Sequence, residues 1–153
     1  MVIQFKRLTE TAKLPFKATK GAACHDIYAD EDVEILPGET KIVKTGFAVQ
    51  LPSGFELQIR MRSGLSTKGI MLANGVGTVD EDYRNEVGVI LHNANRHVAG
   101  ADNVLVHDLT PFQIKKGDRI AQCAVVPVQH WVPIEVAELN VTERTGGYGS
   151  TGS

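Results

Sequence analysis

The feature that most constrains the fold is a run of short, strand-like segments separated at close intervals by turn-forming residues. Residues 55–61 (FELQIRM) alternate apolar and polar side chains without a break, as a strand with one buried face does. Clusters of glycine, proline and aspartate, which favour turns, separate these segments. The other strand-like segments are 41–44, 47–51, 87–91 and 120–126. Such spacing predicts an all-β sandwich, barrel or jelly roll.

One short segment favours a helix instead. Residues Ser63 to Lys68 would make about a turn and a half of α-helix. Ser63 is a good N-cap residue, because its hydroxyl can accept a hydrogen bond from a free amide of the first turn. The predicted fold is therefore all-β with one short helix.

Three other positions have a simple structural interpretation. Asp118 and Arg119 lie in a turn before the last predicted strand and are more typical of a surface ion pair than of ligands. Trp131, which precedes a Val-Pro pair, is most simply a packing residue.

Length and composition place the strands in one domain. The chain has 153 residues, and its net charge of -2 gives no bulk attraction to nucleic acid or to an anionic membrane. Residues 1–13 contain no uninterrupted apolar run, which argues against a signal peptide or membrane anchor. Cys24 and Cys123 are expected to be buried free thiols. We therefore expect a cytoplasmic protein, or a nuclear or organellar one if the source has those compartments.

The last segment of the chain differs from the rest. Residues 144–153 (RTGGYGSTGS) are rich in glycine and serine and bury no core of their own. We expect them to form an arm that is mobile when no ligand is bound. The predicted organisation is a β domain over 1–143, followed by this C-terminal arm. Its arginine and its aromatic ring would allow it to close over an anionic, planar ligand.

Residues 73–88 (ANGVGTVDEDYRNEVG) carry the most informative chemistry. They predict a β-hairpin with apolar and small residues on both arms and an acidic, aromatic tip. Gly75 and Gly77 allow close approach to bare backbone, and Asp80 and Tyr83 follow them. A backbone-lined slot beside a carboxylate and a ring suits a small planar ligand with polar edges.

Other polar residues indicate a phosphate site. Arg62, Ser63 and Gly64 lie where a strand meets the helix, and a guanidinium, a hydroxyl and free amides together suit an anion. Gln122 is the polar member of an otherwise apolar strand and could reach a phosphate oxygen. Asp26 is either an exposed carboxylate or an outer-shell partner of a hydrated divalent cation such as Mg²⁺.

Taken in order, five short segments resemble the five motifs of the trimeric dUTPase family (dUTP pyrophosphatases). Each segment alone is weakly specific, but all five occur in the correct order and span nearly the whole chain. The segments are 23–27 (ACHDI), 62–65 (RSGL), 74–84 (NGVGTVDEDYR), 117–122 (GDRIAQ) and 144–152 (RTGGYGSTG).

This resemblance implies a β-clip-like, distorted jelly-roll fold assembled as a symmetric homotrimer. Each active site would draw on all three subunits. One would give the first, second and fourth motifs, another the hairpin, and the third the C-terminal arm. The implied reaction is hydrolysis of dUTP to dUMP and pyrophosphate, with Mg²⁺ as cofactor. That reaction limits uracil incorporation into DNA and supplies dUMP for dTMP synthesis.

The resemblance also implies a role for each site residue. Asp80 would deprotonate the water that attacks the α-phosphorus, and Tyr83 would pack against the deoxyribose and exclude a 2′-hydroxyl. The uracil would meet the backbone of Gly77, Thr78 and Val79, the Asn74 side chain and the open floor at Gly88. The phosphates would be held by Arg62, Ser63, Gly64 and Gln122, with Asp26 holding Mg²⁺-bound water. The arm would add Arg144 at the γ-phosphate, Tyr148 over the uracil, and Gly149.

Several positions depart from the family pattern. Asn85 replaces the glycine that normally follows the hairpin tip, and asparagine tolerates a positive φ. Tyr148 replaces the more usual phenylalanine, and its spacing from Arg144 is shorter than is common. The connection 95–111 is longer than usual, and residues 103–107 within it could extend a hairpin.

Two alternative functions use the same fold or the same pocket. A dCTP deaminase needs a glutamate where this chain has Ile90, and an apolar side chain cannot shuttle protons. A non-catalytic, regulatory nucleotide-binding module would be expected to lack Asp80, Tyr83 or Arg62, and all three are present. Both alternatives are therefore disfavoured.

Overall fold

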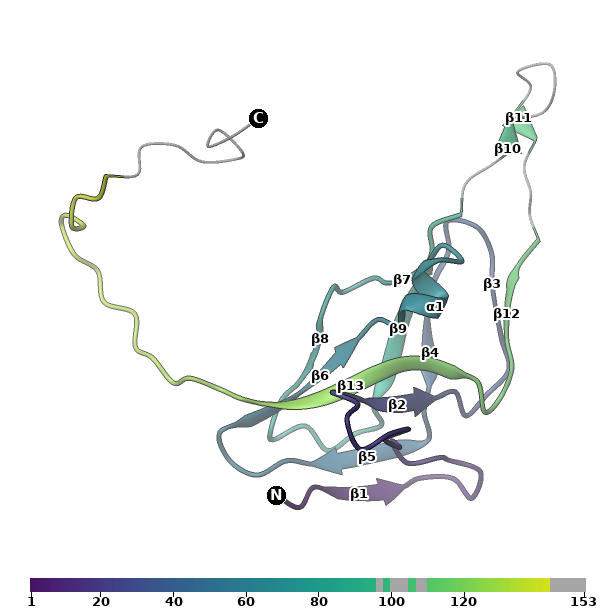
Figure 1. Ribbon diagram of the computed structural model, residues 1–153, viewed down its shortest axis with the longest axis horizontal. Helices are drawn as coiled ribbons and strands as arrows, with labels where there is room; N and C mark the ends of the chain where they lie inside the picture. Colours follow the sequence, from purple (N-terminus) through teal and green to yellow (C-terminus); the bar gives the residue numbers. More distant parts are fainter. Residues whose placement is uncertain (96–97, 100–104, 107–109, 144–153) are drawn as a thin grey trace.

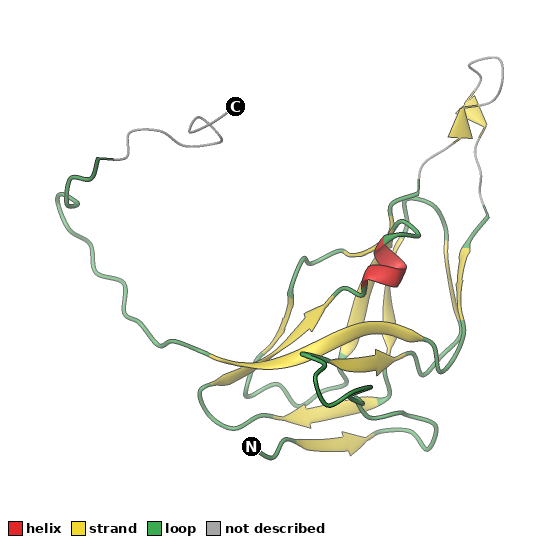
Figure 2. Ribbon diagram, viewed as in Figure 1, coloured by secondary structure: helices red, strands yellow, loops and turns green. Residues whose placement is uncertain are grey.

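The computed structural model describes residues 1–95, 98–99, 105–106 and 110–143, and these are nearly all β (Figures 1 and 2). The described elements are β1 (Gln4–Arg7), β2 (His25–Tyr28), β3 (Val33–Ile35), β4 (Thr40–Lys44), β5 (Phe47–Gln50), β6 (Phe55–Arg60), α1 (Ser63–Ser66), β7 (Ile70–Leu72), β8 (Gly77–Val79), β9 (Gly88–Asn93), β10 (Val98–Ala99), β11 (Leu105–Val106), β12 (Phe112–Ile114) and β13 (Arg119–Pro127). The predicted all-β fold with one short helix is confirmed.

Two antiparallel sheets supply most of one hydrophobic core. The larger sheet has the strand order β2-β13-β6-β8, and the smaller has the order β4-β9-β7. Strands β1 and β5 form a further pair, as do β3 and β12. Fully buried side chains come from both larger sheets, with Ile27 and Leu57 from one and Val43 and Leu91 from the other.

The strands predicted from sequence are all present. In β6 the buried Leu57 and Ile59 alternate with the half-buried Gln58 and Arg60, as the period of two requires. Strand β13 lies beside β6 in continuous antiparallel register from Gln122–Arg60 to Pro127–Phe55. These two strands form the centre of the larger sheet.

The helix is shorter than predicted, and its start is capped differently. Arg62, not Ser63, occupies the N-cap position, and no side chain caps this end. The amides of Leu65 and Ser66 bond instead to the Arg62 carbonyl at 3.0 and 3.1 Å. After this turn the amides of Lys68 and Gly69 bond three residues back, so the helix tightens and ends.

Residues 73–88 do not form the predicted hairpin. Strand β8 pairs with β6 in the larger sheet, whereas β9 pairs with β4 and β7 in the smaller one. Each arm has found an antiparallel partner elsewhere, and β9 pairs with β4 along the whole of β4. Residues 80–87 therefore form a loop that crosses from one sheet to the other.

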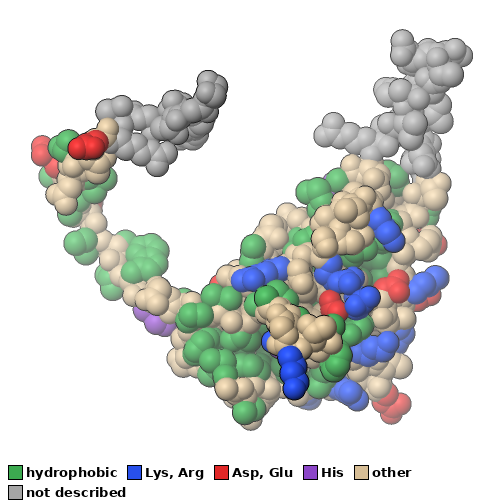
Figure 3. Space-filling view, in the orientation of Figure 1, with side chains coloured by type: hydrophobic (Ala, Val, Ile, Leu, Met, Phe, Trp, Pro, Cys, Tyr) green, Lys and Arg blue, Asp and Glu red, His purple; other side chains and the backbone are tan. Residues whose placement is uncertain are grey.

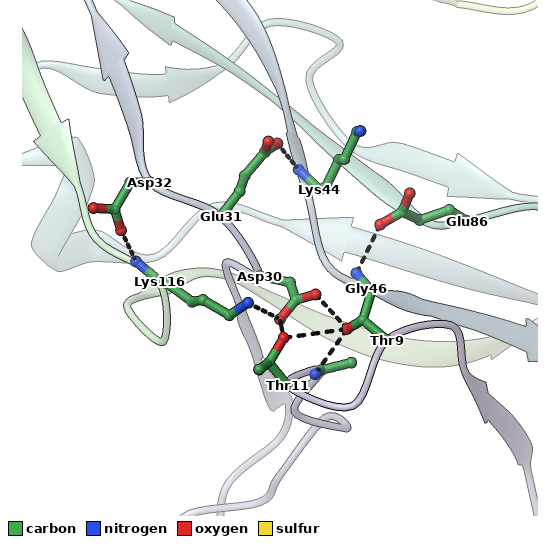
Figure 4. Close-up of polar contacts among 10 residues, drawn as sticks. Thr9, Thr11, Asp30, Glu31, Asp32, Lys44, Gly46, Glu86 and Lys116 are labelled. Atoms are coloured by element: carbon green, nitrogen blue, oxygen red, sulfur yellow. Dashed lines mark hydrogen bonds and ion pairs between the residues drawn. The ribbon is translucent and has the colours of Figure 1, made fainter.

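A carboxylate with little exposure fastens the N-terminal segment to the sheets (Figure 4). The Asp30 side chain is 6% exposed and accepts hydrogen bonds from Thr9 Oγ1 at 2.5 Å and Thr11 Oγ1 at 2.8 Å. Lys116 Nζ lies 3.3 Å from Asp30 Oδ1. Burial raises the pKa of Asp30, but the two hydroxyls and the ammonium group outweigh it and hold the pKa below the ordinary carboxyl value. Gly46 packs directly against this carboxylate, because a Cβ there would lie 2.5 Å from Asp30 Oδ2.

The two cysteines are free, as predicted. Cys123 is buried, and burial is the main reason that its pKa is raised to about 12. Cys24 is only half-buried, so the expectation of burial is wrong for this residue.

The chain leaves the body after Pro127, and residues 128–143 extend away from it without a helix or strand (Figure 1). Hydrophobic side chains along residues 128–143 are exposed (Figure 3), with Trp131 78% and Leu139 85% exposed. The prediction that Trp131 is a packing residue is therefore wrong within this chain. The proposed boundary at residue 143 stays a prediction, because 144–153 lie outside the described residues.

The long connection before β12 contains a small hairpin that projects from the body (Figure 1). Val98 pairs with Val106 and Ala99 with Leu105. Of residues 103–107, which could extend a hairpin, 105–106 form a paired strand, and the others lie outside the described residues. Among the described residues, the single helical turn is far too short to cross a membrane.

Candidate active site

A cavity of about 160 Å³ lies between β8 and β9 and collects the residues predicted to bind a base and a sugar. Its lining is Ile59, Asn74, Gly77, Thr78, Val79, Asp80, Tyr83, Val87, Gly88 and Ile90. The structure therefore brings the arms of the 73–88 segment to one slot, although the arms do not pair with each other. A larger cavity of about 460 Å³, beside the N-terminal residues and β13, contains none of the predicted site residues.

Strand β8 offers free backbone to this slot. It is the outermost strand of its sheet and pairs on one side only, with Leu57–Ile59 of β6. The amide and carbonyl groups on the other edge of such a strand are not used by the sheet. They can pair with the polar edge of a planar ligand.

Two glycines in the slot have close neighbours. A Cβ on Gly77 would lie 3.1 Å from Asn74 Nδ2 and 3.2 Å from Ile59 Cβ. A Cβ on Gly88 would lie 2.6 Å from Ile42 Cγ2. Gly88 lines the slot as predicted, but the contact that excludes a larger residue there is with Ile42.

Asp80 and Tyr83 follow β8 at the start of the crossing loop. The Asp80 side chain is exposed and makes no hydrogen bond or ion pair with any residue that the structure describes. Tyr83 is 39% exposed, and its hydroxyl donates to the Glu86 carbonyl at 2.9 Å. The Tyr83 amide donates to the Asp80 carbonyl at 3.2 Å, which closes a turn. The ring is thus fixed, while the carboxylate of Asp80 is free to act.

The cavity wall on the β9 side is apolar where a deaminase would need an acid. Ile90 lines the slot at that position, and its apolar side chain cannot transfer a proton. This placement agrees with the argument from sequence against a deaminase.

Asp26 lies between two guanidinium groups. Arg62 Nε is 3.0 Å from Asp26 Oδ1, and Arg119 Nη1 is 3.3 Å from Asp26 Oδ2. The Asp26 side chain is only 15% exposed, so the interpretation as an exposed carboxylate is wrong. Arg119 pairs with Asp26, and Asp118 Oδ2 accepts from the Lys115 amide at 2.9 Å. The expected surface pair of Asp118 with Arg119 is therefore wrong as well.

A register shift in β13 completes the support of Arg62. The pairing of β13 with β2 is irregular between Arg119 and Ala121. Such a bulge leaves backbone groups outside the regular ladder. The Arg119 carbonyl accepts a hydrogen bond from Arg62 Nη1 at 2.8 Å. Arg62 is thus oriented by a carboxylate on one side and a carbonyl on the other.

The remaining predicted phosphate ligands lie near Arg62. Ser63 and Gly64 are exposed at the start of α1. Gln122 is half-buried, and its Nε2 donates to the Met61 carbonyl at 2.8 Å, next to Arg62 in the chain. A cavity of about 360 Å³ beside α1 is lined by three cationic side chains, those of Arg62, Lys68 and Arg119. Figure 3 shows Lys and Arg side chains close together on the face that carries α1 and β2.

In one chain these two groups line different cavities. No residue lines both the slot at β8 and β9 and the cationic cavity beside α1. Arg144, Tyr148 and Gly149, predicted to close the site, lie outside the described residues. The described part of a single chain thus presents the residues predicted to bind the base (the base half) and those predicted to bind phosphate (the phosphate half) as separate features.

Sequence reasoning missed Arg119 as a partner of Asp26. Its contact with Asp26 depends on the bulge in β13, which no sequence pattern announced. It also missed the acidic residues that fasten the crossing loop, Glu81 and Glu86, because acidic residues at a predicted hairpin tip look solvated.

Comparison with known proteins gives one consistent result. A family model described as dUTPase matches residues 10–152. The deoxyuridine 5'-triphosphate nucleotidohydrolase of Nautilia profundicola is 45% identical, with 99% of both chains covered. The dUTPase of Staphylococcus bacteriophage 80alpha, solved with dUPNHPP, is 30% identical with a TM-score of 0.84 and 99% of both chains covered. A mutant dUTPase of phage phi11 of S. aureus, described with a coordinated structural Mg(II) ion, is 26% identical with a TM-score of 0.78, covering 92% of this chain and 100% of that one.

The family match includes every described residue of the slot and of the phosphate half, and the fold matches over the same length. This chain belongs to the dUTPase family.

Proposed function

We propose that this chain hydrolyses dUTP to dUMP and pyrophosphate with Asp80 as the general base. Family membership gives the reaction, and one observation carries the assignment of Asp80. Its carboxylate is exposed at the slot and has no partner in the described part of the chain. Such a group can take a proton from water as the water attacks the α-phosphorus in line, and pyrophosphate then leaves. We place the reaction in the cytoplasm, among the precursors of DNA synthesis.

The slot would select the base and the sugar. The free edge of Gly77–Val79 would pair with the polar edge of uracil, and Asn74 lies beside Gly77 to extend that pairing. A thymine methyl would clash in the slot, and cytosine would leave buried polar groups unpaired at a cost of about 1–3 kcal/mol each. The Tyr83 ring, held by its hydroxyl bond to the Glu86 carbonyl, would leave no space for a 2′-hydroxyl.

The phosphates would bind at the other group of residues. Arg62 is already oriented there by Asp26 and by the Arg119 carbonyl, so little ordering is needed when an anion arrives. Ser63, Gly64 and Gln122 would add a hydroxyl, a backbone amide and a side-chain amide. The arm would then close the site through Arg144, Tyr148 and Gly149.

Mg²⁺ fits this site as an ion held mainly by substrate phosphates. The described residues contain no group of three or more His, Cys, Asp and Glu side chains that could form a protein cage. Asp26, a partly exposed carboxylate beside Arg62, fits the outer position that would contact a metal-bound water. The bound ion would neutralise charge on the phosphate oxygens.

We also propose a homotrimer whose sites are shared between subunits. Separation of the two halves in one chain supports sharing, because a substrate must meet the base slot and the phosphate grips together. Exposed apolar side chains along residues 128–143, such as Trp131 and Leu139, support assembly because water is a poor environment for them.

The test of Asp80 is a substitution with a neighbouring control. Asp80→Asn should lower kcat for dUTP by about 10²–10⁴-fold, the usual contribution of a general base, and leave KM close to wild type. Asp82→Asn, which removes the same charge two residues away, should keep wild-type kcat. Turnover is measured as pyrophosphate released with Mg²⁺ and dUTP, dTTP, dCTP or UTP. Equal turnover of all four substrates, or an active Asp80→Asn variant, would refute the proposal.

The test of site sharing is complementation between two inactive variants. Asp80→Asn removes the general base from the crossing loop, and Arg62→Ala removes a residue proposed to bind the phosphates. When the two chains are refolded together in equal amounts, about a quarter of the sites should combine an intact loop with intact grips, if subunits mix at random. Activity near that fraction of wild type supports shared sites. A mixture as inactive as its components would show that each chain builds its own site.

A further inference from the structure

We propose that Glu81 is a positioning residue for the Asp80 base, acting through the turn that joins β5 to β6. This inference rests on the proposed function, because it takes Asp80 as the group that activates water. Nothing in the chemistry of the five motifs assigns a role to Glu81. Its contacts in the structure do.

Both oxygens of the Glu81 carboxylate accept hydrogen bonds from the turn between β5 and β6. Its Oε2 accepts a hydrogen bond from the Gly54 amide at 2.5 Å, and its Oε1 accepts one from the Ser53 hydroxyl at 3.2 Å. Bonds to an ionised acceptor are stronger than bonds between neutral groups. The residue directly after Asp80 is therefore tied to a different part of the chain.

The turn that receives Glu81 is a firm support. Gly54 has a φ of +81°, a conformation that glycine adopts without strain. Its carbonyl accepts a hydrogen bond from the Val128 amide at 2.8 Å, and the next residue, Phe55, pairs with Pro127. The turn thus lies at the joined ends of β6 and β13, the centre of the larger sheet.

The rest of the crossing loop explains why this tie matters for the base. On its N-terminal side, Asp80 follows Val79, which is held by β6 pairing. At the far end of the loop, Glu86 Oε1 accepts from the Gly46 amide at 2.8 Å (Figure 4). Among the residues that the structure describes, Arg84 Nη1 bonds only to carbonyls within the loop, those of Glu81 and Tyr83. Glu81 is thus the side chain that fixes the loop to the body beside Asp80.

Asp80 depends on this tie because its own exposed side chain makes no hydrogen bond or ion pair with the described residues. Its carboxylate is therefore oriented by the backbone, which is held by β8 before it, by the Tyr83 amide on the Asp80 carbonyl, and by the Glu81 side chain after it. A misplacement of about 1 Å in a reacting group can cost about 100-fold in rate. Loss of the Glu81 tie should therefore reduce the chemical step more than substrate binding.

The experiment compares Glu81→Ala with Asp82→Ala, which removes an exposed carboxylate from the same loop. Glu81→Ala should lower kcat about 10–100-fold. Its affinity for the non-hydrolysable analogue dUPNHPP, measured by calorimetry, should stay near wild type, because the β8 edge and the phosphate grips are unchanged. Glu81→Gln should restore most of kcat, since its amide oxygen can still accept from the Gly54 amide. Ser53→Ala, which removes only the longer bond, should have a smaller effect than Glu81→Ala.

The outcomes separate this proposal from the proposed function. If Glu81→Ala matches Asp82→Ala in kcat, the positioning role is wrong, whatever Asp80 does. A purely structural role would lower Tm and weaken dUPNHPP binding in parallel with kcat, and that result also overturns it. If Asp80→Asn stays active in the same assay, the proposed base itself is wrong. Should Glu81→Ala fail to fold, Glu81→Asp decides, because its shorter side chain reaches Gly54 only if the loop moves. A wild-type kcat for Glu81→Asp would refute the proposal.

Discussion

Replacement of Asp30 by alanine should destabilise the fold without touching the proposed catalytic groups. Asp30 is the acceptor that joins Thr9 and Thr11 of the N-terminal segment to the body, and its side chain is 6% exposed. The same carboxylate packs against Gly46, and Figure 4 shows the Gly46 amide bonded to Glu86 of the crossing loop. The N-terminal segment should therefore loosen first when Asp30 is lost.

The size of the effect follows from the three contacts of Asp30. A hydrogen bond to a charged group contributes about 1.5–3 kcal/mol, and a partly exposed pair such as that with Lys116 adds at most about 1 kcal/mol. When Asp30 is lost, the hydroxyls of Thr9 and Thr11 can bond to water instead, so each hydrogen bond is counted at the lower end of this range. We expect Asp30→Ala to reduce the free energy of unfolding by about 3 kcal/mol, which lowers Tm by about 6–12 °C for a chain of this size.

The pH dependence gives a second, independent check. Because the pKa of Asp30 is lowered in the folded state, the stabilisation is fully present above the unfolded-state pKa of about 3.9 and is lost as the pH falls through the folded-state pKa. The difference between wild type and Asp30→Asn should therefore be large at pH 7 and shrink below about pH 4. Urea unfolding at fixed protein concentration measures it, with Glu10→Gln as a charge control in the same segment. A loss below about 1 kcal/mol at pH 7 for Asp30→Ala, or a difference that grows on acidification, would contradict the reasoning.

Two further substitutions test contacts of the site. Asp26→Asn should raise KM for dUTP about tenfold in steady-state assays, because Arg62 loses a charged hydrogen bond of about 1.5 kcal/mol, and an unchanged KM would show that Arg62 needs no such support. Gly88→Ala should cost about 1–3 kcal/mol in urea unfolding, because its Cβ would lie 2.6 Å from Ile42 Cγ2. The double variant with Ile42→Ala should recover that stability, and no recovery would place the strain elsewhere.

Local patterns in the sequence predicted the elements well, because period-two burial is a property of each strand by itself. Strand β6, with Leu57 and Ile59 buried, is an example. Pairing between strands is not local, and this is where prediction failed. The segment 73–88 resembled a hairpin because its two arms are neighbours in sequence. In the structure the first arm, β8, pairs with β6, and the second, β9, pairs with β4.

The site was predicted in the same uneven way. Residues that line the slot, such as Asp80 and Tyr83, stand close together in the chain, so their grouping was visible. The partners of Asp26 were not, because the contact with Arg119 crosses most of the chain and depends on a bulge. Glu81 was overlooked for a related reason, since its partner Gly54 lies in the turn between β5 and β6, 27 residues earlier in the chain.

The crossing of residues 80–87 between sheets has a consequence for fidelity. One wall of the slot, β8, belongs to the larger sheet, and the other, β9, belongs to the smaller one. The width available to a base is therefore the spacing of two layers, and that spacing is set by the packed interior between them. If the slot binds the base as proposed, buried residues such as Leu57 and Leu91 would help to decide whether a methyl group on the base is excluded. Discrimination between bases would then depend on the packed interior of the protein as well as on the residues that line the slot.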